Sequence, residues 1–297
     1  MRITNSTALT SSLSQLDSNR TAIANLQAQI SSGIRLAKPS DDPVAVSEVM
    51  HSNSSLSSLD QYKRNIDSAT SRNSTEGTAL DQLTNILERA KELAVSQSTD
   101  TANATTRKTA AAEMESLFNA AVALAGTKQG TEYLFGGNAV TQPPYTSTGT
   151  GSSLDFTTTN PTGARSVQVS ASQTLVATHD GQQIFGDTGV LAALRDATHA
   201  LQVGDHASIA AAMPGIDNAF DNVQVVQGEQ GARANALTIA SQNMTALKAN
   251  LTAYRSQLQD VDIESAVTEL VTKQNSYQAA MLATSKILGM NLTDYLR

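Results

Sequence analysis

The chain has 297 residues, of which 40% are apolar and only 4% aromatic, so it is long enough to bury a core that consists mainly of small and aliphatic side chains. Its formal net charge of -7 excludes a general nucleic-acid binder, and the absence of cysteine excludes disulfides, thiolate metal sites and a cysteine nucleophile. It contains no apolar run long enough for a transmembrane helix and begins without a cleavable secretory signal, so we expect no membrane insertion and, for a secreted protein, another export route.

Residues 1–40 predict one amphipathic helix that ends near Gly33. Apolar side chains recur there at heptad-like steps, at Leu9, Leu13, Leu16, Ile23, Ile30 and Ile34. A single helix with such a narrow stripe has too little apolar surface to be stable by itself. We therefore expect it to pack against a partner.

Asp42 followed by Pro43 predicts the start of a second, long helix. Aspartate caps free backbone N–H groups, and proline in the first turn loses no hydrogen bond. One apolar stripe continues through this helix, at Leu56, Leu59, Ile66, Ala69, Leu80, Leu83, Leu87, Ala90 and Ala94. The alternative for Asp41 and Asp42, a metal or acid–base pair, is disfavoured because adjacent side chains point in different directions.

The middle of the chain changes composition twice. A helix over residues 104–128, with Met114, Leu117, Ala121 and Leu124 facing inward, is followed by a Ser-, Thr- and Gly-rich segment with short alternating patterns. We interpret residues 137–187 as a small β-rich insert. Helical patterns resume over 188–202, 206–227 and 232–258, with breaks expected at Gly204, Gly228 and Gly231.

The carboxy-terminal residues repeat the pattern of the first forty. Their apolar positions are Ile263, Val267, Leu270, Tyr277, Met281, Leu288 and Leu292. Together these elements predict a mainly α fold, in which long terminal α-helices form an antiparallel coiled coil, followed by a helical-bundle rod domain and a small β-rich insert domain.

The predicted domains are nested along the chain. Residues 1–42 with 259–297 form the terminal coiled-coil assembly domain, residues 43–136 with 188–258 form the helical rod domain, and residues 137–187 form the outer insert.

Several segments resemble the bacterial flagellin family. ISSGIRLAKPSDDPVAVSEV at 30–49 and residues 62–99 are similar to its amino-terminal region, and residues 258–297 to its carboxy-terminal helix. Within the family, PSDDP at 39–43 and YLFGGNAVTQPPY at 133–145 resemble the members that lie at the hook-filament junction.

The resemblance implies a structural, non-enzymatic component of the bacterial flagellum, an adaptor between hook and filament, without cofactor, metal or catalytic residues. The implied partners are further copies of the chain in a ring, the neighbouring hook-associated junction protein, flagellin and a flagellar export chaperone. It also implies an extracellular location reached through the flagellar type III apparatus. The stripes of the two terminal helices are then the expected assembly interface, and Asp42 and Pro43 the expected helix cap.

Three alternatives remain beside this interpretation. A filament flagellin shares the fold and export route but polymerises into the filament itself. A signalling or membrane-surface helix usually has a lysine-rich polar face, which both terminal helices lack. The segment LERAKELAV at 87–95 resembles a flagellin surface recognised by an innate immune receptor, through Arg89 and Leu93.

The four histidines show no local catalytic pattern with a carboxylate or serine. We interpret His51, His179, His199 and His206 as solvent-facing or loop residues. His199 and His206 are seven residues apart, so a metal site between them would require that Gly204 does not break the helix.

Overall fold

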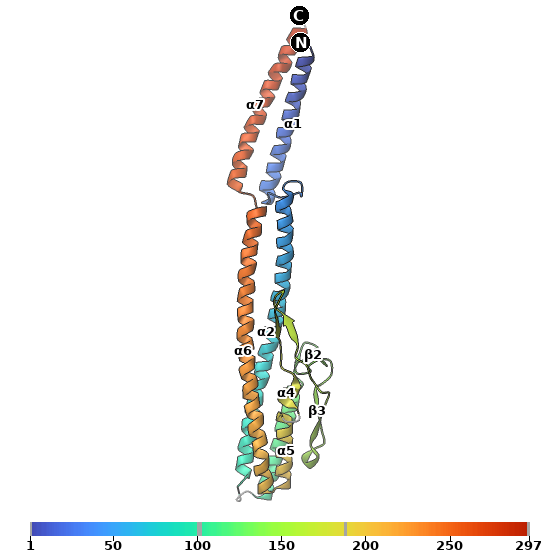
Figure 1. Cartoon of the computed structure of the whole chain (residues 1–297), viewed down its shortest axis with the longest axis vertical. Helices are drawn as coiled ribbons and strands as arrows, with labels where there is room; N and C mark the ends of the chain where they lie inside the picture. The colour runs from blue at the N-terminus through green and yellow to red at the C-terminus, as the bar shows by residue number, and fades with distance from the viewer. Residues whose placement is uncertain (1, 100–102, 187–188, 296–297) are drawn as a thin grey trace. The chain divides into compact units, whose positions relative to one another are not determined.

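The computed structural model of the chain describes residues 2–99, 103–186 and 189–295, with the side chains of 2–6, 8, 9 and 287–295 outside that description (Figure 1). The chain forms two compact units. Unit 1 combines residues 1–57 with residues 247–297, and unit 2 consists of residues 58–246. Two long helices, α2 (Pro43–Gln97) and α6 (His206–Gln259), each contribute to both units.

Unit 1 contains an antiparallel pair of helices from the two ends of the chain. α1 (Arg2–Ser32) and α7 (Ile263–Tyr295) lie side by side and run in opposite directions (Figure 1). α1 ends at Gly33, whose φ of +72° suits a residue without a Cβ. α7 begins after Asp262, whose Oδ1 accepts hydrogen bonds from the backbone N–H groups of Glu264 and Ser265. The predicted antiparallel pairing of the terminal helices is confirmed.

The two linkers beside this pair are joined to each other. The Arg35 backbone N–H donates to the Gln259 carbonyl oxygen (2.8 Å), and the Val261 N–H donates to the Gly33 carbonyl oxygen (3.0 Å). The Arg35 guanidinium also donates to the Leu258 carbonyl oxygen (2.8 Å). These bonds hold the end of α1 next to the start of α7, although the linkers are distant in the sequence.

The acidic pair before Pro43 organises the start of α2. Asp42 Oδ1 accepts a hydrogen bond from the Ala45 N–H (3.0 Å), as a helix cap does, and α2 begins at Pro43. Asp41 Oδ2 accepts from the Lys38 N–H (2.8 Å), inside the preceding turn. The two carboxylates therefore serve two different backbone segments, which is incompatible with a shared metal or acid–base role.

Replacing Asp42 by alanine is expected to lower the free energy of unfolding by about 1 kcal/mol, because the first N–H groups of α2 lose their acceptor. Thermal unfolding followed by circular dichroism measures the change. The matched control is Asp42→Asn, since asparagine caps helices about as well as aspartate. Equal destabilisation by alanine and asparagine would contradict the capping role and point to a role for the charge.

The core of unit 2 lies between α2, α3 (Ala104–Ala125), α5 (Val190–Val203) and α6. All nine positions of the predicted α2 stripe, from Leu56 to Ala94, are buried. On α3, Met114 and Ala121 are buried as predicted, but Leu117 and Leu124 are only half-buried. Phe118 is fully buried instead, because the packed face of α3 is rotated toward it.

The sequence predicts breaks in α6 at Gly228 and Gly231, and this prediction is wrong, because α6 is continuous. Glycine inside a helix costs only about 1 kcal/mol relative to alanine. Contacts with α2 stabilise the helix at this point: Gln230 Nε2 donates to the Asn73 carbonyl oxygen (3.0 Å), and Asn73 Nδ2 donates to the Gln230 carbonyl oxygen (3.3 Å). Tertiary packing therefore outweighs the local helix-breaking tendency.

The β structure consists of three separate antiparallel pairs among the described residues. Their strands are β1 (Lys128–Gln129) with β2 (Glu132–Tyr133), β3 (Tyr145–Thr148) with β4 (Asp155–Thr158), and β5 (Ser166–Gln168) with β6 (Thr174–Val176). A 3-10 turn, η1 (Gly151–Ser153), precedes β4, and a short helix, α4 (Gly181–Phe185), follows β6. The β-rich character predicted for the insert is confirmed, whereas the division into three domains stays a prediction.

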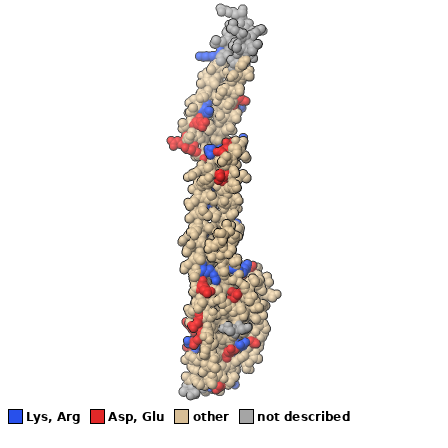
Figure 2. Space-filling model, in the orientation of Figure 1, with Lys and Arg blue, Asp and Glu red and all other residues tan. Residues whose placement is uncertain are grey.

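Charged side chains are sparse on the face of the molecule shown in Figure 2. They lie in small groups of both signs, separated by uncharged surface. This pattern agrees with a chain in which only 16% of the residues are charged. On this face no extended basic surface is present for a polyanion.

Candidate assembly surface

Unit 1 exposes more large apolar side chains than its size predicts. Among the described side chains, fifteen large hydrophobic residues are exposed, and ten of them belong to unit 1, the smaller of the two units. They are Leu13, Val44, Met50, Leu247, Tyr254, Ile263, Val267, Val271, Met281 and Leu282. Concentrated exposed apolar surface marks a site where another molecule binds.

α7 divides its residues between a packed face and an open face. Ala266 and Thr284 are buried. Eighteen residues separate them, which is five turns at 3.6 residues per turn, so they lie on one line along the helix. Ile263, Val267 and Val271 are 58%, 41% and 50% exposed and follow each other in steps of four. Leu26 is the buried described residue of α1. α7 thus buries small residues, and its aliphatic side remains open.

The predicted interface residues fall into three groups. Leu13, Ile263, Val267 and Met281 are exposed, and Leu16, Ile23, Ile30, Ile34, Leu270 and Tyr277 are half-buried. The side chains of Leu9, Leu288 and Leu292 lie outside the described residues, although their backbones belong to α1 and α7. Leu13, Leu16 and Tyr277 line a common hollow of about 660 Å³ between the two helices.

The sequence analysis did not identify two residues of the open face, Val271 and Leu282. Leu282 is 70% exposed, which is more than any predicted position whose side chain is described. Both lie beside the predicted heptad stripe and widen it. The apolar face of a packed helix covers more than 100°, so a sequence search for a face of that width would have included both residues.

The segment at 87–95 buries four residues, Leu87, Ala90, Leu93 and Ala94, within the chain and exposes the others. Leu93 is buried in the core of unit 2. Arg89 forms ion pairs with Glu92 (2.6 Å) and Glu113 (2.7 Å), and these hydrogen-bonded carboxylates raise its pKa. This arrangement leaves Leu93 inaccessible to a receptor in the folded chain.

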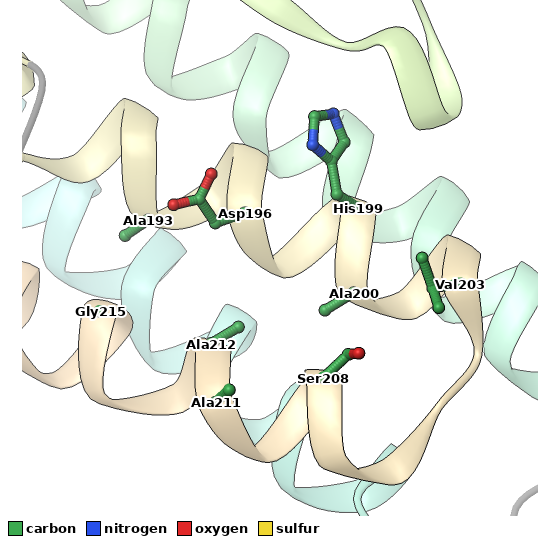
Figure 3. A pocket seen from close by; sticks show the side chains of 9 residues that line it. All are labelled: Ala193, Asp196, His199, Ala200, Val203, Ser208, Ala211, Ala212 and Gly215. Carbon is green, nitrogen blue, oxygen red and sulfur yellow. The ribbon is translucent and has the colours of Figure 1, made fainter.

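A hollow in unit 2 lies between α5 and the first turns of α6 (Figure 3). Its lining is mostly small: Ala193, Ala200, Ala211, Ala212 and Gly215 contribute. Asp196, His199 and Ser208 are its polar lining residues, and they bond to Arg195, the Leu154 carbonyl oxygen and Asp205 within the chain.

The histidines at this end of unit 2 are separated by the break expected from the sequence. Gly204, with φ +75°, ends α5, so His199 and His206 belong to different helices. His199 Nε2 lies 2.8 Å from the Leu154 carbonyl oxygen. Among the described residues, no group of three or more His, Asp or Glu side chains is placed to hold a metal ion. Within the same range, no helix is long and apolar enough to cross a membrane.

Two family models match the chain. Residues 3–139 match the bacterial flagellin N-terminal helical region, and residues 213–296 match the bacterial flagellin C-terminal helical region. These matches contain α1, α2, α3, α7 and most of α6.

Individual proteins of two kinds are similar to the chain. Flagellar hook-associated protein 3 of Escherichia coli strain K12 is 28% identical over 309 residues, which cover 92% of this chain and 95% of that protein. The flagellin of Bacillus subtilis strain 168 is 28% identical over 322 residues and covers both chains completely. The crystal structure of a flagellar hook-associated protein 3 from Legionella pneumophila aligns with a TM-score of 0.63, at 14% identity, over 71% of this chain and 98% of that chain. At that identity the structural likeness shows the fold alone.

Proposed function

The chain belongs to the bacterial flagellin family, and we propose that it is a structural subunit of the flagellum, an adaptor that joins the hook-associated ring to the flagellin filament. The open apolar face of unit 1 carries this proposal. It lies on α1, α7 and the adjacent turns of α2 and α6, within the segments that match the family models. A subunit that assembles through its terminal helices needs such a surface.

The interface of the proposed assembly consists of the predicted apolar stripes of α1 and α7, extended by Val271 and Leu282. None of the stripe residues with described side chains is fully buried within the chain, so each retains surface that a neighbouring subunit can cover. Because the apolar area is covered only on assembly, most of the stabilisation of these helices is gained when the subunit is incorporated.

The proposed partners follow from family membership and from the names of the relatives. They are other copies of this chain, the adjacent hook-associated junction protein, flagellin and an export chaperone. The proposed location is the outside of the cell, reached through the flagellar type III apparatus. A chain that passes unfolded through a narrow channel acquires its order afterwards, which suits helices whose stability depends on neighbours.

The junction role is favoured over the filament role by three segments. PSDDP at 39–43, YLFGG at 133–137 and LTDYLR at 292–297 resemble junction proteins, and the E. coli relative is named as one. The similarity to a complete flagellin, at the same identity, makes a filament subunit the second candidate. We propose a structural role for the chain in both cases and no catalytic one.

Immunogold electron microscopy of intact flagella, with an antibody against residues 141–174, is expected to label one narrow band between hook and filament. This segment contains many exposed side chains, so the antibody can reach it. A strain that lacks the gene is the control for antibody specificity. Label along the whole filament would establish a filament flagellin instead. Flagella without label, from cells in which the protein is secreted, would contradict both roles.

A further inference from the structure

Four side chains from three segments of unit 2 form a polar cluster, which we call the latch. It consists of Glu76 on α2, His179 after β6, and Glu229 and Arg233 on α6. Glu76 is fully buried and His179 is buried, whereas Glu229 is half exposed. Buried polar groups are retained only where their hydrogen bonds are satisfied, so the latch is a specifically organised contact.

Each atom of the buried carboxylate has a partner. Glu76 Oε1 accepts from the His179 backbone N–H (3.1 Å) and lies 2.6 Å from the His179 ring atom Nδ1. Glu76 Oε2 accepts from Arg233 Nη1 (3.0 Å). The other ring nitrogen of His179, Nε2, lies 2.7 Å from Glu229 Oε2.

This geometry suits an imidazole that carries two protons and faces two ionised carboxylates. Ionised carboxylates only accept hydrogen bonds, and a neutral imidazole has a single N–H to donate. Both ring nitrogens of His179 lie at hydrogen-bond distance from a carboxylate oxygen, so both bonds form only with the imidazolium. The charges then balance, with two carboxylates opposite one guanidinium and one imidazolium.

The latch lies beside a small apolar contact that involves the β5–β6 hairpin. Val169 and Ala177 of this region pack with Ile66 of α2 and Leu237 of α6. This cluster is separate from the main core of unit 2 and much smaller. The latch therefore adds to a small apolar cluster and to the hydrogen bond from Asn65 Nδ2 to the Gln168 carbonyl oxygen (3.0 Å).

We propose that the latch is a proton-dependent contact. It holds residues 174–180 against α2 and α6 while His179 carries both ring protons, and it weakens this attachment when one proton is lost. This inference does not depend on the proposed function, since it uses only contacts within unit 2.

The direction of the pH dependence follows from the groups that face the ring. Burial acts to lower the pKa of His179, but the hydrogen bond and charge of Glu76 and the bond to Glu229 outweigh it, and the pKa is raised above 6.5. Arg233, whose Nη2 lies 3.2 Å from Nε2, opposes this increase. Stabilisation from a raised pKa is fully present below the unfolded value and is lost as the pH rises through the folded value. The latch is thus closed below the ordinary histidine pKa and loosens as the pH rises through the raised pKa of His179.

The two carboxylate contacts of His179, to Glu76 and to Glu229, respond differently when the ring proton is lost. Glu76 is buried and keeps its bonds to Arg233 and to the His179 backbone, so the remaining ring proton is held best on Nδ1. Glu229 is 54% exposed and can turn toward water. The hydrogen bond between His179 and Glu229 of α6 is therefore the one that is lost.

Two measurements on the full-length chain test the proposal. Nitrogen-15 NMR of histidine-labelled protein is expected to show His179 doubly protonated at about pH 6, with a titration midpoint above the ordinary histidine value, and Glu229→Gln is expected to lower that midpoint. Hydrogen exchange, corrected for its intrinsic pH dependence, is expected to show protection of the amides of residues 174–180 falling by up to about tenfold per pH unit between the ordinary histidine pKa and the His179 titration midpoint, and levelling off above that midpoint.

The controls separate a proton switch from a merely structural contact. His179→Gln should remove the pH dependence of protection at 174–180, whereas His199→Gln, at a histidine paired with a backbone carbonyl, should leave it unchanged. A His179 ring that is neutral at about pH 6 would overturn the proposal. Equal protection of 174–180 in the wild-type chain at about pH 6 and pH 9 would overturn it as well.

Discussion

Replacing Val267 and Val271 of α7 together by aspartate is expected to abolish incorporation of the subunit into the flagellum, and with it swimming. The two side chains are 41% and 50% exposed on the open face of α7. In an assembly that covers this face, two carboxylates would be buried without partners, and each costs several kcal/mol. In the isolated chain the new charges face water, so the folded state is preserved.

The measurements are motility in soft agar, electron microscopy of the flagella and the amount of subunit in the culture medium. The expected outcome is exported subunit in the medium, short or absent filaments, and a circular dichroism melt of the purified variant that matches the wild type. Ser276→Asp is the matched control, because position 276 is exposed on the same helix but lies off the line of Ile263, Val267 and Val271. Normal motility of the double variant would remove the open face of α7 from the proposed interface.

The second large effect concerns the fold of unit 2. Replacing Glu76 by alanine is expected to lower the free energy of unfolding by about 3–5 kcal/mol, because removing one partner of a buried charged network leaves the others uncompensated. Arg233 and His179 would both lose their buried acceptor. Denaturant unfolding followed by circular dichroism measures the difference.

A companion variant shows whether burial is the cause. Glu229→Ala removes the other carboxylate of the latch, but this side chain is 54% exposed, so a change below about 1 kcal/mol is expected at neutral pH. If Glu76→Ala lowers the free energy of unfolding as little as Glu229→Ala does, the buried carboxylate does not contribute substantially to the stability of the fold.

Much of the helical architecture follows from local sequence patterns. The stripe from Leu56 to Ala94 is buried as predicted because every helical turn must place its apolar side toward the core. Asp42 with Pro43 and the glycines at 33 and 204 mark helix ends because capping and left-handed backbone conformations depend on the residue itself and on its immediate neighbours.

Other features depend on contacts between distant segments. α6 passes through Gly228 and Gly231 because Gln230 bonds to Asn73 on α2, a contact that lies 157 residues away in the sequence. The sequence analysis placed His179 among solvent-facing or loop histidines, and this was wrong, since it is buried between carboxylates from two helices. A single histidine in a β-rich segment has no local sequence pattern from which carboxylate partners on distant helices could be predicted.

The candidate assembly surface also combines features set by local sequence with features set by tertiary contacts. The sequence by itself determined that α1 and α7 carry apolar stripes and need partners, because heptad spacing and the lack of apolar area are properties of each helix alone. Only the tertiary structure decided which part of each stripe is covered within the chain. Leu26 of α1 and Ala266 and Thr284 of α7 are buried, whereas Ile263, Val267, Val271 and Leu282 stay exposed. The rotation of one helix against another depends on how side chains from both helices fit together, and a single-helix pattern does not contain that information.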